Sequence, residues 1–400
     1  MTRLDDLCKL IVDCEHKTAP VQEHGYPSIR TPNIGRGYFL LEGVNRVSEE
    51  TYSAWTRRAI PRGGDLILAR EAPVGNVAVI PEGEQYCLGQ RTVLIRPDGY
   101  RVDSYYLCFM LLTPELQGQL LGKSGGATVH HLNMKDIRAF RMPSLPSLPE
   151  QRRAASVVRA YDDLIATNQR RIALLEDAAR RLYREWFVHL RFPGHESVLV
   201  KDGVPEGWVK LPLGDVAGIT MGQSPESKYY NTDGDGLPFH QGVSDFGHRF
   251  ITHKTFTKQA TRVAAAGDIL CSVRAPVGRL NLTRDNIAIG RGLSAMRSRA
   301  GHQSLLFYQL GALFVEEDMI GGGAIFASVG KKELFGQLIL QPKAEISAEF
   351  DRLVSDIDLQ INTLDLQNRS LSDARDLLLP KLMSGQLDVS GIPLPEEVAA

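Results

Sequence analysis

The sequence has few cysteines, no long apolar run and almost no net charge. Its cysteines are odd in number and lack a CxxC pair, which favours reduced thiols over a disulfide framework or a zinc site; they are Cys8, Cys14, Cys87, Cys108 and Cys271. The longest notable uncharged run, residues 300–315, is too short and too polar to span a membrane. Asp5, Asp6 and Lys9 interrupt any secretory apolar segment. We therefore expect a cytoplasmic protein without a metal site or a membrane partner.

The formal net charge of −1 does not by itself indicate a nucleic-acid partner, so a DNA-binding surface would need locally concentrated positive charge. The length of 400 residues exceeds what one hydrophobic core usually organises. We therefore expect at least two domains.

Motifs for catalysis and metal binding are missing as well. Residues 321–332 resemble a phosphate-binding loop but lack both a required glycine and the magnesium-binding Ser or Thr. Residues 231–236 resemble the start of an EF-hand loop, but Gly242 stands where its glutamate belongs. His130 and His131 have no metal ligand at a suitable spacing, so we interpret them as loop residues or as polar contacts to a partner. Together these absences argue against a self-contained enzyme.

One phrase of a dozen residues occurs twice. Residues 64–75 read GDLILAREAPVG and residues 267–278 read GDILCSVRAPVG. Each copy predicts a short strand that ends in a tight Pro-Val-Gly turn. Flanking segments match at offsets that drift from 211 to 197: residues 25–37 with 236–247, 88–91 with 289–292, and 125–137 with 322–334. Drifting offsets indicate two related domains that differ by small loop insertions, because a tandem solenoid would have a far shorter period.

A long helical pattern follows each copy. We expect helices at about 150–190 and 345–383, each beginning after the prolines that end its repeat. Seam residues recur three and four positions apart, which predicts coiled-coil packing. The first seam is Val158, Tyr161, Ile165, Asn168, Ile172, Leu175, Ala179, Leu182 and Trp186; the second is Val354, Ile357, Ile361, Leu364, Asn368, Leu371, Arg375 and Leu378.

The charges of the two helical segments favour pairing with each other. Residues 150–185 carry eight Arg against six Asp or Glu, a balance of +2, and residues 345–381 carry four Lys or Arg against eight Asp or Glu, a balance of −4. Opposite balances suit partner helices, although exposed ion pairs mainly set orientation. The alternative is that each helix packs alone on its own domain.

Specific phrases in the linkers and helices resemble the specificity subunit of type I restriction–modification systems. They are RRLYREWFVHLRFPG at 180–194, VPEGWVKLPLGDVA at 204–217 and LLLPKLMSGQLDV at 377–389. LPFHQGVSDFG at 237–247 and the doubled APVG fit the same family. The resemblance covers nearly the whole chain.

The resemblance implies an α+β fold in which two pseudo-repeated α/β target-recognition domains are joined by two long antiparallel helices that form a coiled coil. The expected divisions are a first recognition domain (1–148), a central spacer helix (149–190), a linker with the second recognition domain (191–342), a C-terminal spacer helix (343–390) and a tail (391–400).

The resemblance also implies a division of labour. This chain would be a non-catalytic subunit in which each recognition domain reads one half of a bipartite site in double-stranded DNA. Two methylation subunits, docked on the helices, would bring S-adenosylmethionine and the adenine-methylating site. Two restriction subunits would bring the ATP- and Mg-dependent activities. No cofactor is expected in this chain.

The candidate DNA contacts are polar side chains on loops, because phosphate contacts require Arg, Lys and amides while base contacts require side chains that reach a groove. In the first domain they are Arg30, Asn33, Arg36, Arg70, Arg91, Lys123, Thr128, His130 and His131; in the second they are His240, Gln241, Ser244, Arg274, Arg279, Arg291 and Lys331. Arg70 and Arg274 stand out, because both lie just before the repeated Ala-Pro-Val-Gly turn. For each residue the alternative is an ordinary solvated side chain.

The heptad register gives one more expectation. With Val158 and Val354 at position a, Asn168 falls at d and Asn368 at a. Antiparallel helices pair a with d, so the two asparagines are predicted to lie adjacent and to fix the register. The alternative is two unrelated polar positions on the seam.

Two other functions remain open at this point. One is a coiled-coil scaffold whose globular domains bind protein or peptide, which the mild net charge favours. The other is a fused methyltransferase–nuclease, which would need a cofactor fingerprint that the sequence lacks.

Overall fold

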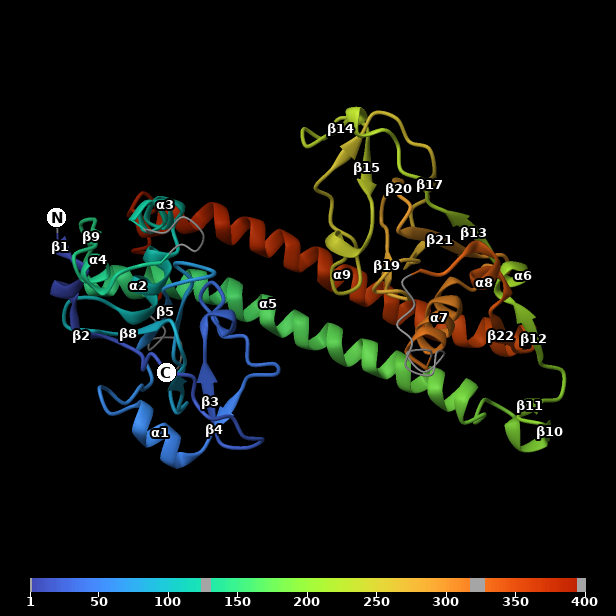
Figure 1. Cartoon of the computed structure of the whole chain (residues 1–400), viewed down its shortest axis with the longest axis horizontal. Helices are drawn as coiled ribbons and strands as arrows, with labels where there is room; N and C mark the ends of the chain where they lie inside the picture. The colour runs from blue at the N-terminus through green and yellow to red at the C-terminus, as the bar shows by residue number, and fades with distance from the viewer. Residues whose placement is uncertain (1, 124–130, 317–327, 394–400) are drawn as a thin grey trace. The chain divides into compact units, whose positions relative to one another are not determined.

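The computed structural model of the chain describes residues 2–123, 131–316 and 328–393. It contains two compact units (Figure 1). The first unit comprises residues 1–169 and 366–400, and the second comprises residues 170–365. The structure is mixed α+β, as expected, and includes two long helices, α5 (Leu148–Tyr183) and α9 (Ala344–Met383). Each long helix contributes residues to both units.

The first unit is organised around a four-stranded antiparallel sheet in the order β2-β8-β5-β6. Strand β5 (Leu66–Ala69) is buried along its whole length. Leu66 and Leu68 pack into one core cluster together with helix α2 (Ser104–Leu111), and Ile67 packs into another on the opposite face. Because both faces of this strand are covered, its sequence is a continuous apolar run rather than an alternating one.

A smaller sheet in the order β4-β3-β7 completes the first unit, and its strands β3 and β7 are parallel. The remaining strands are β1 (Thr2–Arg3), β2 (Cys8–Asp13), β3 (Tyr26–Ile29), β4 (Arg46–Val47), β6 (Val77–Val79), β7 (Cys87–Leu88), β8 (Thr92–Pro97) and β9 (Arg141–Met142). The helices are α1 (Glu49–Trp55), α3 (Pro114–Lys123) and α4 (Met134–Arg138), with single turns η1 (Leu4–Leu7) and η2 (Thr31–Asn33).

The second unit repeats this plan. Its four-stranded antiparallel sheet has the order β13-β21-β18-β19, and a second sheet, β14-β16-β15-β20-β17, contains the parallel pair β15 and β20. The strands are β10 (Val200–Lys201), β11 (Val204–Pro205), β12 (Val209–Pro212), β13 (Ala217–Met221), β14 (Tyr230–Asn231), β15 (Leu237–His240), β16 (Phe256–Thr257), β17 (Val263–Ala264), β18 (Ile269–Ser272), β19 (Leu280–Leu282), β20 (Ile287–Ile289), β21 (Leu293–Ser298) and β22 (Leu338–Gln341). The helices and single turns are α6 (Leu213–Val216), α7 (Gln303–Glu316), α8 (Lys331–Gly336), η3 (Arg184–Val188), η4 (His195–Ser197), η5 (Ser227–Tyr229) and η6 (Val243–Asp245).

The repeated phrase occupies the same place in both units. It forms β5 and the following turn in the first, and β18 and the following turn in the second. The turns carry matching backbone hydrogen bonds: Gly75 N donates to Ala69 O, and Gly278 N donates to Ser272 O. Both Ala-Pro peptide bonds in these turns are cis. The sequence repeat is therefore a repeat of strand and turn geometry.

Within each unit, part of α5 packs against part of α9 in the opposite direction. In the first unit, Val158 shares a core cluster with Leu379, and Asp162, one turn later, forms an ion pair with Arg375 at 2.6 Å. In the second unit, Ile172 packs with Ile361 and Leu364, and Ala179, two turns later, shares a core cluster with Phe350 and Val354. Buried or half-buried positions of α5 recur at 158, 161, 165, 168 and 172, which are the positions of the predicted seam.

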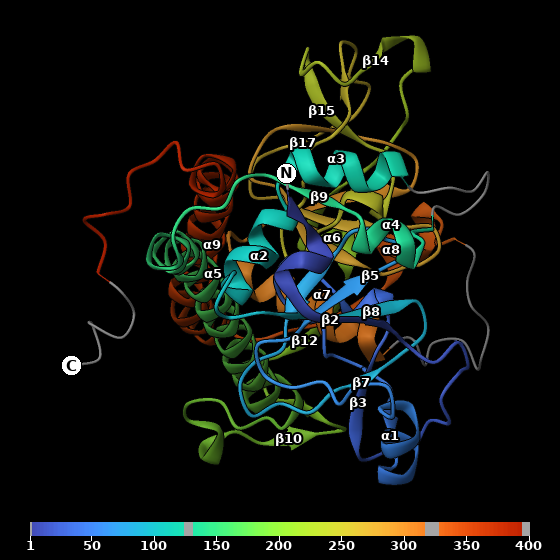
Figure 2. The ribbon, with the colours of Figure 1, turned by 90° about the vertical axis from the view of Figure 1, so that its left-hand side faces the viewer.

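Helix α2 of the first unit contacts both long helices. Figure 2 shows α2 beside the beginning of α5. Asp103 N donates to Gln151 Oε1 at 2.9 Å, and the Arg159 guanidinium lies 4.1 Å from the centre of the Tyr105 ring. Tyr106 Oη donates to Met383 O at 2.8 Å, which joins α2 to the end of α9. The described part of the chain contains no helix that is both long and apolar enough to cross a membrane.

Candidate nucleic-acid interface

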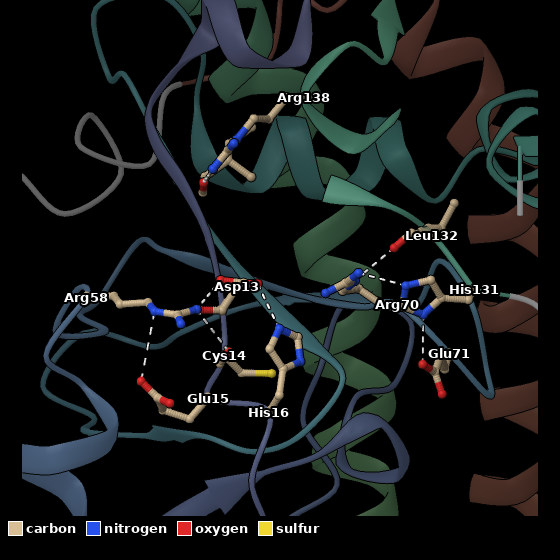
Figure 3. Close-up of polar contacts among 11 residues, drawn as sticks. Asp13, Cys14, Glu15, His16, Arg58, Arg70, Glu71, His131, Leu132 and Arg138 are labelled. Atoms are coloured by element: carbon tan, nitrogen blue, oxygen red, sulfur yellow. Dashed lines mark hydrogen bonds and ion pairs between the residues drawn. The ribbon is translucent and has the colours of Figure 1, made fainter. Parts of the chain in front are cut away.

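Arg70 follows β5 and lies in the interior of the first unit. Its side chain is only 6% exposed. Its Nε donates to Leu132 O at 2.8 Å, and its Nη2 lies 2.7 Å from His131 Nε2 (Figure 3). A buried guanidinium with these partners holds residues 131–132 against the strand end. Arg70 is therefore placed to position the loop, and it is not presented on the surface as the sequence suggested.

Glu71 links two of the predicted residues to Arg70. Its Oε1 lies 2.7 Å from His131 Nδ1, and its Oε2 lies 2.9 Å from Arg91 Nε. His131 is thus held between a carboxylate and a guanidinium, as Figure 3 shows. The structure brings Arg70, Arg91 and His131 into one network, which leaves the Arg91 side chain on the surface beside a neutralising acid.

A second polar cluster lies at the end of β2 in the same unit (Figure 3). Arg58 pairs with Asp13 and lies 3.9 Å from Glu15, and His16 Nε2 is 3.0 Å from Asp13 Oδ2. Arg138 donates from Nη2 to Ile11 O at 2.7 Å. Because acidic and basic groups alternate here, this cluster stabilises the strand end without forming a positive surface.

The second unit has a cleft next to the repeated turn. The cleft has a volume of about 190 Å³, and its lining includes Gln241, Arg274 and Gly292. Gln241 and Arg274 are exposed, and among the described residues the Arg274 guanidinium has no hydrogen bond or ion pair. Ser224 lies beside them, donating to Gln241 Oε1 at 2.6 Å and accepting from the Arg291 backbone N at 3.2 Å. The structure therefore brings Gln241, Arg274 and the Arg291 backbone to one place.

His240 precedes Gln241 but is fully buried. Its Nδ1 lies 3.1 Å from Asp245 Oδ2 and its Nε2 lies 2.9 Å from His253 Nδ1. Burial lowers the pKa of His240, although the hydrogen bond to Asp245 acts in the opposite direction. His253 Nε2 in turn lies 3.1 Å from Asp285 Oδ2. His240 is thus a buried structural link at the end of β15, next to the cleft residue Gln241, which corrects its assignment to a loop.

The remaining candidates are scattered. Asn33 uses its side chain within its own loop, because Oδ1 accepts from Arg30 N and Nδ2 donates to Leu40 O. Arg36 donates from Nη2 to Leu112 O at 2.8 Å. Further exposed candidates belong neither to the network of Arg70, Glu71 and His131 nor to the cleft beside Gln241; they are Arg30, Lys123, Ser244, Arg279 and Lys331. Thr128 and His130 lie outside the described residues.

The two units do not place Arg70 and Arg274 at equivalent positions. Arg70 N donates to Arg91 O at 2.9 Å, and Val273 N donates to Gly292 O at the same distance. Arg70 therefore corresponds to Val273, and the counterpart of Arg274 is Glu71. The two arginines both precede the repeated turn, but they stand one position apart, and at the position shared by Glu71 and Arg274 the units carry opposite charges.

Sequence reasoning missed Ser224 and Glu71. A residue-by-residue match of the two repeated phrases places Glu71 opposite Arg274, so the sequence held a signal for that residue. Ser224 had none, because its contact is made with a residue 17 positions away on another element.

The seam asparagines both belong to the first unit. Asn168 is 7% exposed. The Asn368 Oδ1 atom is buried and accepts no hydrogen bond from the described residues. A buried oxygen without a hydrogen bond destabilises a helix pair. A polar residue on the seam can nevertheless favour one alignment of the two helices over others. The adjacency of Asn168 and Asn368 remains a prediction.

No group of His, Cys, Asp and Glu among the described residues has the arrangement of a metal site. The second unit also has a cavity of about 380 Å³, and the charged residues in its lining form ion pairs. Arg249 pairs there with Asp358, and Arg284 lies 2.8 Å from Asp365. These ion pairs attach the fold of the second unit to α9, so we assign the cavity a structural role.

Comparison with known proteins indicates one family. Residues 1–177 match the model of the type I restriction modification DNA specificity domain. The chain is 29% identical over 338 residues to a putative type I restriction enzyme specificity subunit, MjaX, of Methanocaldococcus jannaschii, an alignment that covers 82% of this chain and 79% of the relative. It is 20% identical to the HindI specificity subunit of Haemophilus influenzae, covering 91% of this chain and 95% of the relative.

A solved structure has a similar fold. It is the crystal structure of the S subunit of a type I restriction–modification system from M. genitalium, with a TM-score of 0.61 at 14% identity. The match covers 95% of each chain.

Proposed function

The chain belongs to the family of type I restriction–modification specificity subunits, and we propose that its two units are target-recognition domains that each read one half of a bipartite DNA sequence. The observation that carries the proposal is the repeated sheet order, β2-β8-β5-β6 and β13-β21-β18-β19. Equivalent loop positions in the two units carry different polar side chains, such as Glu71 and Arg274. A shared scaffold with different loops suits the reading of two different half-sites.

The proposal assigns the long helices a spacer and docking role as an antiparallel coiled coil. Within each unit their contacts run in opposite directions. Several leucines on these helices point into solvent, with exposed fractions from 44% to 66%: Leu164, Leu366 and Leu377 in the first unit and Leu174 and Leu359 in the second. Apolar side chains of this kind are suited to a protein partner. We assign them to the docking of two methylation subunits.

The same proposal places all chemistry on partner subunits in the cytoplasm. The methylation subunits would bring S-adenosylmethionine, and two restriction subunits would bring ATP and Mg for cleavage. The chain itself binds double-stranded DNA and is not a catalyst.

The test is to map methylated adenines in cells that contain the methylation subunits, with and without this chain. The proposal expects a bipartite methylated motif only when the chain is present. A gel shift of the purified complex should weaken steeply with salt, because phosphate contacts release counterions. Binding that is insensitive to salt, with no motif, would instead support a scaffold for protein or peptide.

A further inference from the structure

Arg30 and Gln241 occupy the same position in the two units. Each follows a strand that pairs in parallel, with Ile29 opposite Leu88 in the first unit and His240 opposite Ile289 in the second. The hydrogen bonds that fix the position also match. Gly89 N donates to Ile29 O, and Gly290 N donates to His240 O, both at 2.8 Å. The first residue after the strand is Arg30 in the first unit and Gln241 in the second.

A glycine lies directly under each of these side chains. A Cβ atom on Gly89 would come within 2.4 Å of Arg30 Cγ, and a Cβ atom on Gly290 would come within 2.5 Å of Gln241 Oε1. Any other residue would displace the side chain above it. In both units, therefore, one polar side chain packs directly against the backbone of a glycine.

Both side chains remain able to bind a ligand. Each is exposed, and among the described residues the Arg30 guanidinium makes no hydrogen bond or ion pair. Gln241 lines the cleft beside Arg274, which adds positive charge there. By contrast, Asn33, Arg70 and His131 are occupied by neighbouring groups.

Ser224 sets the orientation of the Gln241 amide. Its hydroxyl donates to Gln241 Oε1 at 2.6 Å, while its oxygen accepts from Arg291 N. This bond uses one lone pair of Oε1 and leaves the second lone pair and the Nε2 protons available. A donor beside an acceptor is the pattern that complements adenine, whose major-groove edge offers N7 and N6–H2.

Resting on the proposed function, we propose that Arg30 and Gln241 are the equivalent base-reading residues of the two half-sites, and that Gln241 selects adenine while Arg30 selects guanine. An arginine can donate two hydrogen bonds to guanine O6 and N7, and a glutamine can exchange two with adenine N6 and N7. Ser224 is then a positioning residue, because it acts on the base through Gln241. The half-sites thus differ in one base because the shared position differs in one side chain.

The experiment is a reciprocal exchange in the full chain, assembled with its methylation subunits. The variants are Gln241→Arg, Arg30→Gln and Ser224→Ala. Methyl transfer is measured in competition on duplexes in which each base pair of the wild-type motif is replaced in turn. Exposed residues away from the site supply matched controls, Gln259→Arg in the second unit and Arg57→Gln in the first.

The expected result is a change at one base pair in one half-site per variant. Gln241→Arg should convert an adenine preference into a guanine preference in one half, and Arg30→Gln should do the reverse in the other half. Each change should alter the ratio between the two bases by roughly 5- to 150-fold. Ser224→Ala should weaken the adenine preference without replacing it, and Ser224→Thr should restore it. The controls should leave the motif unchanged.

Other outcomes would overturn the inference. An unchanged motif would exclude base contacts, and a uniform loss of rate with a weaker salt dependence would assign these side chains to phosphates. If Gln241→Arg did not fold, as judged by its melting curve, the isosteric Gln241→Glu would replace it, because loss of the Nε2 donor should also abolish the adenine preference. A wild-type complex without any bipartite motif would refute the proposed function itself, whereas a wild-type motif that all variants preserve would refute only this inference.

Discussion

Replacing Arg249 with methionine should destabilise the second unit far more than any exposed ion pair could. Arg249 is 4% exposed and connects the recognition fold to both long helices. It pairs with Asp358 of α9, lies 3.6 Å from Glu176 of α5, and donates to Tyr308 Oη at 3.2 Å. Asp358 also accepts hydrogen bonds from Tyr308 and from Ser304. The substitution would leave the Asp358 carboxylate without the cation that it pairs with. It would also remove one of the basic groups beside Glu176, which would keep His248 and Arg180.

The expected loss is about 3–5 kcal/mol, because removal of one partner of a buried pair leaves an uncompensated charge. For a unit of this size the melting temperature should fall by roughly 6–20 °C. Trp186 and Trp208 are buried in the second unit, so tryptophan fluorescence reports on its unfolding, and calorimetry gives the enthalpy.

The chain provides a matched control for Arg249 on the same carboxylate. Arg180 lies 3.6 Å from Glu176, but its side chain is 63% exposed. Arg180→Met should therefore cost less than about 1 kcal/mol. Equal melting temperatures for Arg249→Met and Arg180→Met would refute the reasoning, because burial would then have no influence on the strength of the pair.

The destabilisation should also depend on pH. Burial would raise the pKa of Glu176, but the hydrogen bond from His248 and the charges of Arg249 and Arg180 lower it below its ordinary value of 4.5. A lowered carboxylate pKa contributes stability above the unfolded value, and this contribution is lost as pH falls through the folded value. The difference between wild type and Arg249→Met should thus be full at pH 7 and shrink below about pH 4.5.

Four further predictions follow from the same contacts and from the proposed function. Arg375→Met should lower the melting temperature of the first unit more than Asp162→Asn, because only the former leaves the half-buried Asp162 carboxylate, whose pKa is already raised by burial, without its cation. Asn368→Leu should raise the free energy of unfolding by about 1–3 kcal/mol in denaturant titrations, since it removes a buried oxygen without a hydrogen bond; a loss of stability would show that Oδ1 is satisfied. Exchange of residues 1–148 for those of another family member should change one half of the methylated motif, and changes in both halves would contradict independent reading. The purified chain alone should not transfer methyl groups to DNA in a radiolabel assay, and a turnover abolished by a point substitution in this chain would refute that.

Much of the fold could be predicted because its signals are local. The phrases at 64–75 and 267–278 specify a strand and a turn from apolar runs, proline and glycine alone, and the structure has β5 and β18 there. The expected helices at about 150–190 and 345–383 are observed at 148–183 and 344–383. Helical periodicity is written into neighbouring residues, so it needs no knowledge of distant contacts.

The polar site could not be predicted in the same way. Arg70 and Arg274 look alike in the sequence, yet Leu132 and His131, about sixty positions away, enclose only Arg70. His240 and Gln241 are neighbours, yet His240 ends β15 and is buried against Asp245 and His253, whereas Gln241 follows the strand and is exposed. Composition and spacing name polar residues that could bind DNA, but they carry no information about which of them other segments will cover.

The duplicated strand and turn, the two helices with their seams and the lack of a recognisable catalytic motif can all be read from the amino-acid sequence, because each is encoded within a short window. Folding alone encloses Arg70 while it leaves Arg274 exposed, and it alone brings the Arg30 and Gln241 side chains onto the glycines at equivalent positions. Hydrogen-bond partners and burial depend on segments that are distant in the sequence and are brought together only by folding. A side chain is free to read DNA only where no such segment has already satisfied it.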